Sequence, residues 1–473
     1  MKLPPMLRGA WLPFLILVLL AFAWRMPYAA SKPIGHVDEV SYSLPTAQRL
    51  LAGEKVLYIS GTNYGAPVQE ALAAVVFKAF GESTAGLRLP TVVIGSLAVG
   101  LAFLALRRAT GPGVALGIGL FLALANSTNA RYTTFAHPCY ATALAMVGCI
   151  QLATLWCDTK RTFLRWLVLG TIMGAAFYVL TLTLFQSFVS LAWLAVRSEY
   201  FQRLRERITQ GNRLPRLRAG IFTAALGLLV LSPVGYHYLT RRATYVISPL
   251  ETAIAIVATV LIAAGAIIGG STLCAPRRGE IVSVTCCLAM FTLLPMPAAV
   301  WFRTVEQPRL VAQHIEPYSE ATYNFKHRHE WPNSARLLMQ GVFPALLIGR
   351  FNEVRPVEES EHLGWKAAVA AAILLALAAA AICRGRTRTP MPRSREADAV
   401  FIGPLLLLLI VLCPSWLLHS ELSVRYLEPF LAGFFLLCFR CLERWIATYP
   451  RTTAALGGSY IAYCAVDCFY NIT

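Results

Sequence analysis

The sequence predicts an all-α integral membrane protein, organised as a single polytopic domain (residues 1–473) with about thirteen transmembrane helices. Apolar residues make up 57% of the 473 positions and charged residues only 14%, whereas soluble proteins carry roughly 25% charged residues. Apolar runs that approach the roughly 20 residues needed to cross a bilayer recur along the whole chain. Because a backbone in lipid must satisfy its own hydrogen bonds, we expect these runs to be helices.

Basic residues are distributed unevenly between these runs. The formal net charge is +18, and residues 197–218 contain seven arginines but only two acidic residues. Residues 302–365 contain seven basic and eight acidic residues. Basic loops stay on the cytoplasmic side of membrane proteins, so we place the first segment inside and the second outside. Membrane orientation thus explains the excess charge, and no nucleic-acid partner is expected.

The expected spans alternate in direction, with the N-terminus inside and the C-terminus outside. The first apolar run has the length of a signal-peptide core, but Pro27 and Tyr28 are poor residues for the cleavage site that would follow it, so we assign it as the first helix. The spans lie near residues 10–24, 89–106, 112–126, 137–156, 163–180, 181–196, 219–236, 252–270, 281–301, 366–383, 400–419, 426–439 and 454–470.

Two long segments lie on the outer side, residues 27–88 and residues 302–365. Neither contains any of the 12 cysteines, so we expect the cysteines to pack as small apolar residues instead of forming a disulfide framework. We expect interfacial helices in both segments, because an apolar run such as 335–349 is too short to cross the bilayer. Polar chemistry on the outer side is therefore expected in these two segments.

Asp38 and Glu39 form an adjacent acidic pair in the first outer segment, shortly after the first span. At this depth, near the lipid phosphates, a carboxylate can act as general base on an acceptor hydroxyl, an effect typically worth ~10²–10⁴ in rate. The alternative is an ordinary solvated acidic pair in a loop.

The order of several short motifs resembles the GT-C glycosyltransferases. These multi-pass enzymes use polyprenyl-phosphate-linked sugars and include the lipid A aminoarabinose transferases and the protein O-mannosyltransferases. Members typically show an Asp-Glu pair after the first helix, a stretch ending in Phe-Gly, and an Arg-Leu-Pro-like start of the second helix. The matching residues here are Asp38-Glu39, Phe80-Gly81 and Arg88-Leu89-Pro90, followed by Ala130-Arg131-Tyr132 and by Arg425-Tyr426 with Pro429.

This resemblance implies a GT-C-like fold and an inverting glycosyltransferase. Asp38 would be the catalytic base, and Glu39 would orient the acceptor or hold the local structure. The donor would be a polyprenyl-phosphate sugar whose phosphate leaves as the acceptor oxygen attacks C1. The acceptor is a lipid, a glycan or a protein, and the expected location is a bacterial cytoplasmic membrane with the active side facing outward.

Two departures from the aminoarabinose transferases argue against a lipid A acceptor. Those enzymes often carry an acidic residue in the second outer turn, where this chain has His137-Pro138. Their motif near Pro67 contains Lys and Glu, whereas this chain reads Tyr64-Gly65-Ala66-Pro67, with Gln69-Glu70 slightly later. His137 could contact sugar or phosphate, or it could be a polar cap at a helix start.

A leaving phosphate needs cations around it, and arginine suits that geometry. The family pattern favours Arg131 and Arg425, while other outward cations such as Arg241, Arg242, Lys326 and Arg328 meet lipid headgroups by default. The expected substrate-binding residues are Lys55, Tyr64, Glu70, Arg131, His137, Arg425 and Tyr426.

No cofactor is assigned, and a divalent metal is left open. Residues 326–331 (KHRHEW) place two histidines at spacing i, i+2, which share one face of a strand but not of a helix. No third ligand stands nearby in the sequence, although closed and catalytic sites both require at least three protein ligands.

Two other functions remain open on the sequence. A flippase or transporter of lipid-linked sugars predicts ionisable residues inside the spans, and Asp467 is the main example. A polymerase or ligase of surface polysaccharide shares the long outer segments and the lipid-linked substrate. The position of Asp38-Glu39 directly after the first span favours the glycosyltransferase.

Overall fold

The computed structural model describes residues 9–31, 34, 38–60, 65–137, 139–198, 278–313, 395–412, 427–448 and 450–472. Within these ranges the regular secondary structure is helical, without β-strands, as predicted. The expected spans near 219–236, 252–270 and 366–383 and the apolar run 335–349 lie outside the described residues. The predicted total of about thirteen helices therefore stays a prediction.

The helices follow the predicted order. The first part of the chain contains α1 (Trp11–Ser31), η2 (Glu39–Ser43), α2 (Leu44–Leu51), α3 (Val68–Phe80), α4 (Thr84–Ala109), α5 (Pro112–Ala123), α6 (Ser127–Tyr132), α7 (Tyr140–Thr159), α8 (Phe163–Val179) and α9 (Thr183–Val196). The later part contains α13 (Arg278–Leu293), α14 (Met296–Trp301), η3 (Phe302–Glu306), α15 (Gln307–Ala312), α21 (Arg395–Ala397), η6 (Asp398–Ile402), α22 (Gly403–Leu412), η8 (Glu428–Phe430), α24 (Leu431–Thr448) and α25 (Pro450–Ile472).

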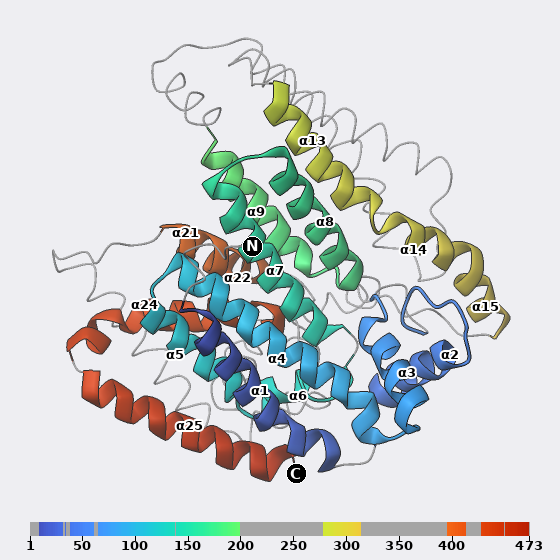
Figure 1. Cartoon of the computed structure of the whole chain (residues 1–473), viewed down its shortest axis with the longest axis horizontal. Coiled ribbons are helices and arrows are strands. Elements are labelled where there is room, and N and C mark those ends of the chain that lie inside the picture. The colour runs from blue at the N-terminus through green and yellow to red at the C-terminus, as the bar shows by residue number, and fades with distance from the viewer. Residues whose placement is uncertain are drawn as a thin grey trace.

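Four stretches of helix in the described part of the chain are long and apolar enough to cross a membrane: Trp11–Ala30, Thr84–Ala109, Tyr140–Thr159 and Val282–Ala312. Helices α5, α8 and α9 are apolar but shorter. Figure 1 shows α1, α4 and α7 side by side, with α8 and α13 packed together beyond α7 and with α2 and α3 at one end of the bundle. The protein is thus a bundle of apolar helices with a smaller helical cap at one end.

Small residues allow the helices to approach closely. An added Cβ at Gly170 in α8 would overlap the backbone of Cys287 in α13, and one at Gly433 in α24 would overlap the backbone of Phe401. Such contacts between small residues and backbone are typical of membrane helix interfaces, where lipid competes with every apolar side chain. Eight of the cysteines in the described ranges are free thiols, in agreement with packing and not disulfide formation.

Two of the helix starts that differ from the sequence prediction have a clear local cause. Helix α4 begins at Thr84 and not near Leu89, because the Ser83 hydroxyl caps it by accepting from the Gly86 amide (3.1 Å). Arg88 therefore lies inside the helix. Helix α7 begins at Tyr140 and not at His137, because Cys139 adopts a left-handed backbone conformation (φ 68°) that interrupts the helix.

The two predicted outer segments contact each other where both are described. Arg49 of α2 donates two hydrogen bonds to Glu306, with distances of 3.0 Å to Oε1 and 3.1 Å to Oε2. Arg309 donates to the same carboxylate from one turn later. The ion pair joins the cap formed by η2, α2 and α3 to the beginning of residues 302–365.

Candidate active site

Asp38 lies at the beginning of η2, in the short connection between α1 and the cap. Its backbone is already helical (φ −65°, ψ −35°), so the side chain is held by regular structure and not by a loose loop. The side chain is 11% exposed, whereas that of the next residue, Glu39, is fully buried. The two adjacent carboxylates therefore have different environments.

His137 is the neighbour of Asp38 on the other side of the site. The His137 Nδ1 atom lies 3.1 Å from Asp38 Oδ2, and the histidine is fully buried. An ionised carboxylate only accepts hydrogen bonds, so Nδ1 carries the hydrogen in this contact. The backbone carbonyl of His137 accepts a hydrogen bond from the Gln69 side chain (3.0 Å), which ties this residue to α3. The fold thus brings together two predicted site residues, Asp38 and His137, that are 99 positions apart in the sequence.

Glu39 forms a buried ion pair with Arg88. Arg88 Nε and Nη2 each donate to one oxygen of the carboxylate at 2.7 Å, and the Ala136 amide donates to Oε1 at 2.9 Å. Burial alone would raise the pKa of the Glu39 carboxyl, but the bonds from Arg88 and Ala136 outweigh it and hold the pKa below its ordinary value. Of the two roles expected for Glu39, this geometry matches holding the local structure.

An aromatic ring connects two arginines in the same region. The Arg88 guanidinium lies 4.4 Å from the centroid of the Phe135 ring, and the Arg131 guanidinium lies 5.9 Å from it. Arg131 is half-buried at the C-terminal end of α6. No acidic side chain within the described ranges forms an ion pair with it, in contrast to Arg88. Arg131 thus packs against the Phe135 ring, and no carboxylate of the described ranges neutralises its charge.

Glu70 lies behind the site and not on its surface. It is 1% exposed, and its Oε1 accepts a hydrogen bond from the Ser43 hydroxyl (2.8 Å), which also contacts the Ala136 carbonyl (2.7 Å). Its Oε2 has no hydrogen-bond partner in the described part of the chain. Burial raises the pKa of the Glu70 carboxyl to about 7. The predicted substrate contact from Glu70 would therefore need the cap to open, whereas its bonds connect η2 to the backbone next to His137.

The remaining predicted residues are dispersed or lie outside the described ranges. Lys55 is exposed in the turn after α2. Tyr64, Arg425 and Tyr426 lie outside the described residues, as does the whole of residues 326–331. The structure thus brings together Asp38, Glu39, Glu70, Arg131 and His137.

Sequence reasoning missed the partners that organise these residues. Arg88 was recognised only as part of an Arg-Leu-Pro motif, although an arginine within an apolar span is itself a signal that a buried carboxylate must be near. Ser43 and Gln69 carried no signal, because nothing local distinguishes a buried polar contact from a solvated one.

The described residues contain no group of three or more His, Cys, Asp or Glu side chains arranged to hold a metal ion. Asp38 and His137 are a pair of candidate ligands, fewer than the three protein ligands of a typical catalytic zinc site.

No protein-family model matches this chain, and no curated protein matches it significantly. Similar solved structures include the oligosaccharyltransferase from Archaeoglobus fulgidus in complex with zinc and sulfate, at 12% identity and a TM-score of 0.45. That match covers 97% of this chain and 53% of the oligosaccharyltransferase, so this chain spans about half the length of that protein.

A second similar structure is ArnT from Cupriavidus metallidurans bound to undecaprenyl phosphate. It is 16% identical, with a TM-score of 0.34, and the match covers 92% of this chain and 78% of ArnT. Both matches have TM-scores below 0.5, and the function of this chain is inferred from its own residues.

Proposed function

We propose that this chain is an inverting glycosyltransferase of the GT-C type that moves a sugar from a polyprenyl-phosphate donor to an acceptor on the extracytoplasmic face of the membrane. The observation that carries the proposal is the contact between Asp38 and His137. A partly exposed carboxylate, held by a fully buried imidazole at the end of an apolar helix bundle, is suited to take a proton from an acceptor.

Asp38 acts as general base in this mechanism. The acceptor oxygen attacks C1 of the sugar as its proton moves to the Asp38 carboxylate. The new C1–O bond forms while the bond between C1 and the phosphate oxygen breaks, so the configuration at C1 inverts and the polyprenyl phosphate leaves. His137 donates from Nδ1 to Oδ2, which fixes the orientation of the carboxylate in the site. Such preorganisation lowers the barrier because no reorientation is needed in the transition state.

Arg131 stabilises the leaving phosphate. Negative charge increases on the phosphate oxygens as the bond to C1 breaks, and a positioned guanidinium opposes that charge with two donors. Arg131 is half-buried, stacks on Phe135, and has no carboxylate partner within the described ranges. By contrast, the charge of Arg88 is neutralised by Glu39. Of the two arginines that contact Phe135, Arg131 is therefore the one assigned to the donor.

The arrangement of charge supports an extracytoplasmic reaction. The arginine-rich segment 197–218 belongs to the opposite side of the membrane from residues 27–88 in the predicted topology. A polyprenyl phosphate would enter with its chain among the helices and its phosphate near the cap. The acceptor is a lipid, glycan or protein that reaches Asp38 from outside.

The test is mass spectrometry of the lipids that co-purify with the Asp38→Asn variant in mild detergent, together with a transfer assay in membranes. Enrichment of a polyprenyl-phosphate sugar over the wild type, with transfer lost, is the expected result. Glu82→Gln is the matched control, since Glu82 is an exposed carboxylate of the same outer segment. Full transfer by Asp38→Asn would overturn the role of Asp38. Movement of labelled lipid across vesicles without covalent transfer would instead favour a flippase.

A further inference from the structure

The backbone of Ala136, directly before His137, is held by η2 through both of its polar groups. The Ala136 amide donates to Glu39 Oε1 at 2.9 Å, and the Ala136 carbonyl accepts from the Ser43 hydroxyl at 2.7 Å. Glu39 and Ser43 are the first and last residues of η2, and Asp38 lies at the N-terminus of this helix. The two bonds therefore fix the position of His137 relative to Asp38.

The Ser43 hydroxyl lies between two oxygen atoms. It is 2.7 Å from the Ala136 carbonyl oxygen and 2.8 Å from Glu70 Oε1, and both distances are typical of an O–H···O hydrogen bond. A hydroxyl has one hydrogen to donate, and a carbonyl oxygen can only accept. Both bonds therefore form together only when Glu70 is protonated and donates to the Ser43 oxygen. When Glu70 is ionised, its carboxylate competes with the Ala136 carbonyl for the single Ser43 hydrogen.

The surroundings of Glu70 favour the protonated form. Its side chain is almost completely buried, and its Oε2 has no hydrogen-bond partner in the described part of the chain. Arg88 of α4, a helix that packs against α3, pairs with Glu39. Arg49 of α2, the other helix packed against α3, pairs with Glu306. No ion pair within the described ranges includes Glu70, and burial raises the pKa of its carboxyl to about 7.

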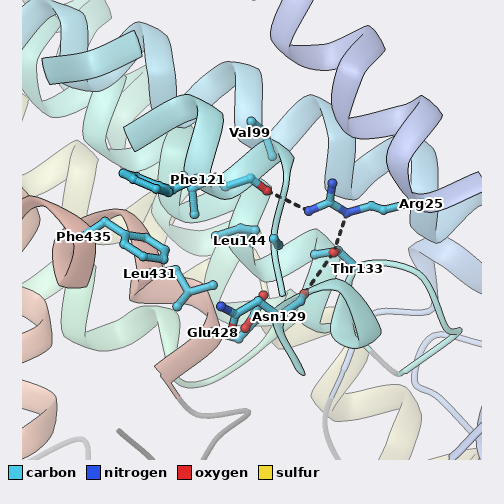
Figure 2. A pocket seen from close by; sticks show the side chains of 11 residues that line it. Arg25, Val99, Phe121, Asn129, Thr133, Leu144, Glu428, Leu431 and Phe435 are labelled. Carbon is cyan, nitrogen blue, oxygen red and sulfur yellow. Dashed lines mark hydrogen bonds between the residues drawn. The ribbon is translucent and has the colours of Figure 1, made fainter. Parts of the chain in front are cut away.

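The beginning of the same segment is held from the helix bundle. Arg25 of α1 donates from Nε to the Thr133 hydroxyl at 2.7 Å, as Figure 2 shows. This hydroxyl also lies 3.2 Å from each of two carbonyls of α6. These contacts do not include Glu70, so the ionisation of that carboxyl acts on the Ala136 end of the segment.

We propose that Glu70 is a positioning residue that acts in its protonated form. It donates to Ser43, which in turn donates to the Ala136 carbonyl. This chain of bonds holds His137 beside Asp38. When Glu70 loses its proton to the solvent, the Ser43 hydrogen turns to the carboxylate and the Ala136 carbonyl loses this donor. His137 is then less firmly held, so transfer slows as the pH rises. The proposal rests on the proposed function for the reaction that it affects.

The first experiment measures kcat against pH for the wild type and for Glu70→Gln. Glutamine keeps an N–H donor to Ser43 and cannot ionise. Between about pH 6 and about pH 9 the wild-type kcat should fall about tenfold, as for a displaced catalytic group, while KM for the donor changes within about twofold. The kcat of Glu70→Gln should fall less than about twofold over this interval. A fall equal to that of the wild type would overturn the proposal.

Two variants serve as controls for this profile. Glu82→Gln changes an exposed carboxylate of the same outer segment and should follow the wild type. Thr133→Val removes the bond from Arg25 to the same segment, and it should lower kcat while keeping the fall with pH. If Glu70→Gln does not fold, Ser43→Ala replaces it. This variant lacks the hydroxyl that both contacts need, so its kcat should be low throughout, and a fall like that of the wild type would overturn the proposal.

The second experiment does not depend on transfer. The infrared C=O stretching band of the protonated carboxyl, identified by its loss in Glu70→Gln, should disappear in the wild type with a midpoint at about pH 7. Over the same interval the NMR ring signals of His137, identified by their loss in His137→Asn, should diverge between the wild type and Glu70→Gln. An absent band below this pH, or a constant difference in the His137 signals, would overturn the proposal. The expected band and signals in a chain without glycosyl transfer would refute the proposed function alone.

Discussion

Arg88 and Glu39 are joined by two parallel hydrogen bonds of 2.7 Å in the interior of the protein, although both belong to regions that the sequence assigned to the outer surface or to a helix end. Neither side chain is more than 2% exposed. The pair joins the beginning of α4 to η2, immediately after Asp38. It is one of the links between the membrane bundle and the cap.

Arg88→Leu should destabilise the protein strongly. Removing one partner leaves the other charge buried and unpaired, which typically costs about 3–5 kcal/mol. The free energy of unfolding, measured by denaturant titration in mixed micelles, provides the check. Arg107→Leu is the control, because Arg107 is an arginine of the same helix that donates an exposed hydrogen bond to the Gly9 carbonyl in the described part of the chain. Equal stability of the two variants would show that the buried Arg88–Glu39 pair is not needed for stability.

The buried Glu70 carboxyl should make the free energy of unfolding fall as the pH rises from 4.5, the ordinary pKa of this carboxyl, to about 7, its pKa in the folded protein. In this interval the folded protein holds a proton that the unfolded chain has released, so raising the pH favours unfolding. The rise in pKa from 4.5 to about 7 corresponds to roughly 3 kcal/mol of unfolding free energy, and this whole amount is lost above pH 7.

The measurement is the difference in unfolding free energy between wild type and Glu70→Gln at several pH values. The difference should change between pH 4.5 and 7 and then level off. Glu82→Gln, at an exposed carboxylate, should show no such change relative to wild type. If the difference between wild type and Glu70→Gln stays constant with pH, the buried carboxyl is not the source of the pH dependence.

His137→Leu should reduce transfer more than His137→Asn. Leucine removes the donor to Asp38, and a hydrogen bond to a charged group is worth about 1.5–3 kcal/mol, equivalent to roughly a ten- to hundredfold change in rate. Asparagine keeps an N–H donor of similar reach. Comparison of kcat at saturating donor checks this order, and equal rates for wild type and His137→Leu would refute the role of the imidazole.

Arg131→Gln should weaken the interaction with the donor, and Arg131→Lys should recover only part of it. Lysine keeps the charge but loses the planar fork and the stacking on Phe135. We expect KM for the donor to rise or kcat to fall by at least about tenfold in Arg131→Gln. Lys78→Gln serves as the control, since Lys78 is an exposed cation of the same outer segment and has no assigned role. A matching loss in Lys78→Gln would indicate a general effect of surface charge.

Hydropathy alone predicted the helical class and the order of the described spans. A long apolar run in a bilayer forms a helix because a helix satisfies the backbone hydrogen bonds within the segment. Helices α5, α8 and α9 follow the predicted boundaries within a few residues. Asp38 and His137 were each singled out from the sequence as well. The helix starts at Thr84 and Tyr140 were not predicted, since they depend on the Ser83 cap and on the left-handed Cys139.

The tertiary structure alone decided which of these residues meet. Asp38 and His137 are 99 positions apart, and Glu39 and Arg88 are 49 apart. The tertiary structure also decided that Glu39 and Glu70 are almost completely buried, at 0% and 1% exposed, while the Asp38 side chain is 11% exposed. Hydropathy and short motifs describe neighbours along the chain. Contacts over such separations depend on how α1, α4, α7 and the cap pack, and those interfaces are set by small residues and buried polar pairs without a local signature.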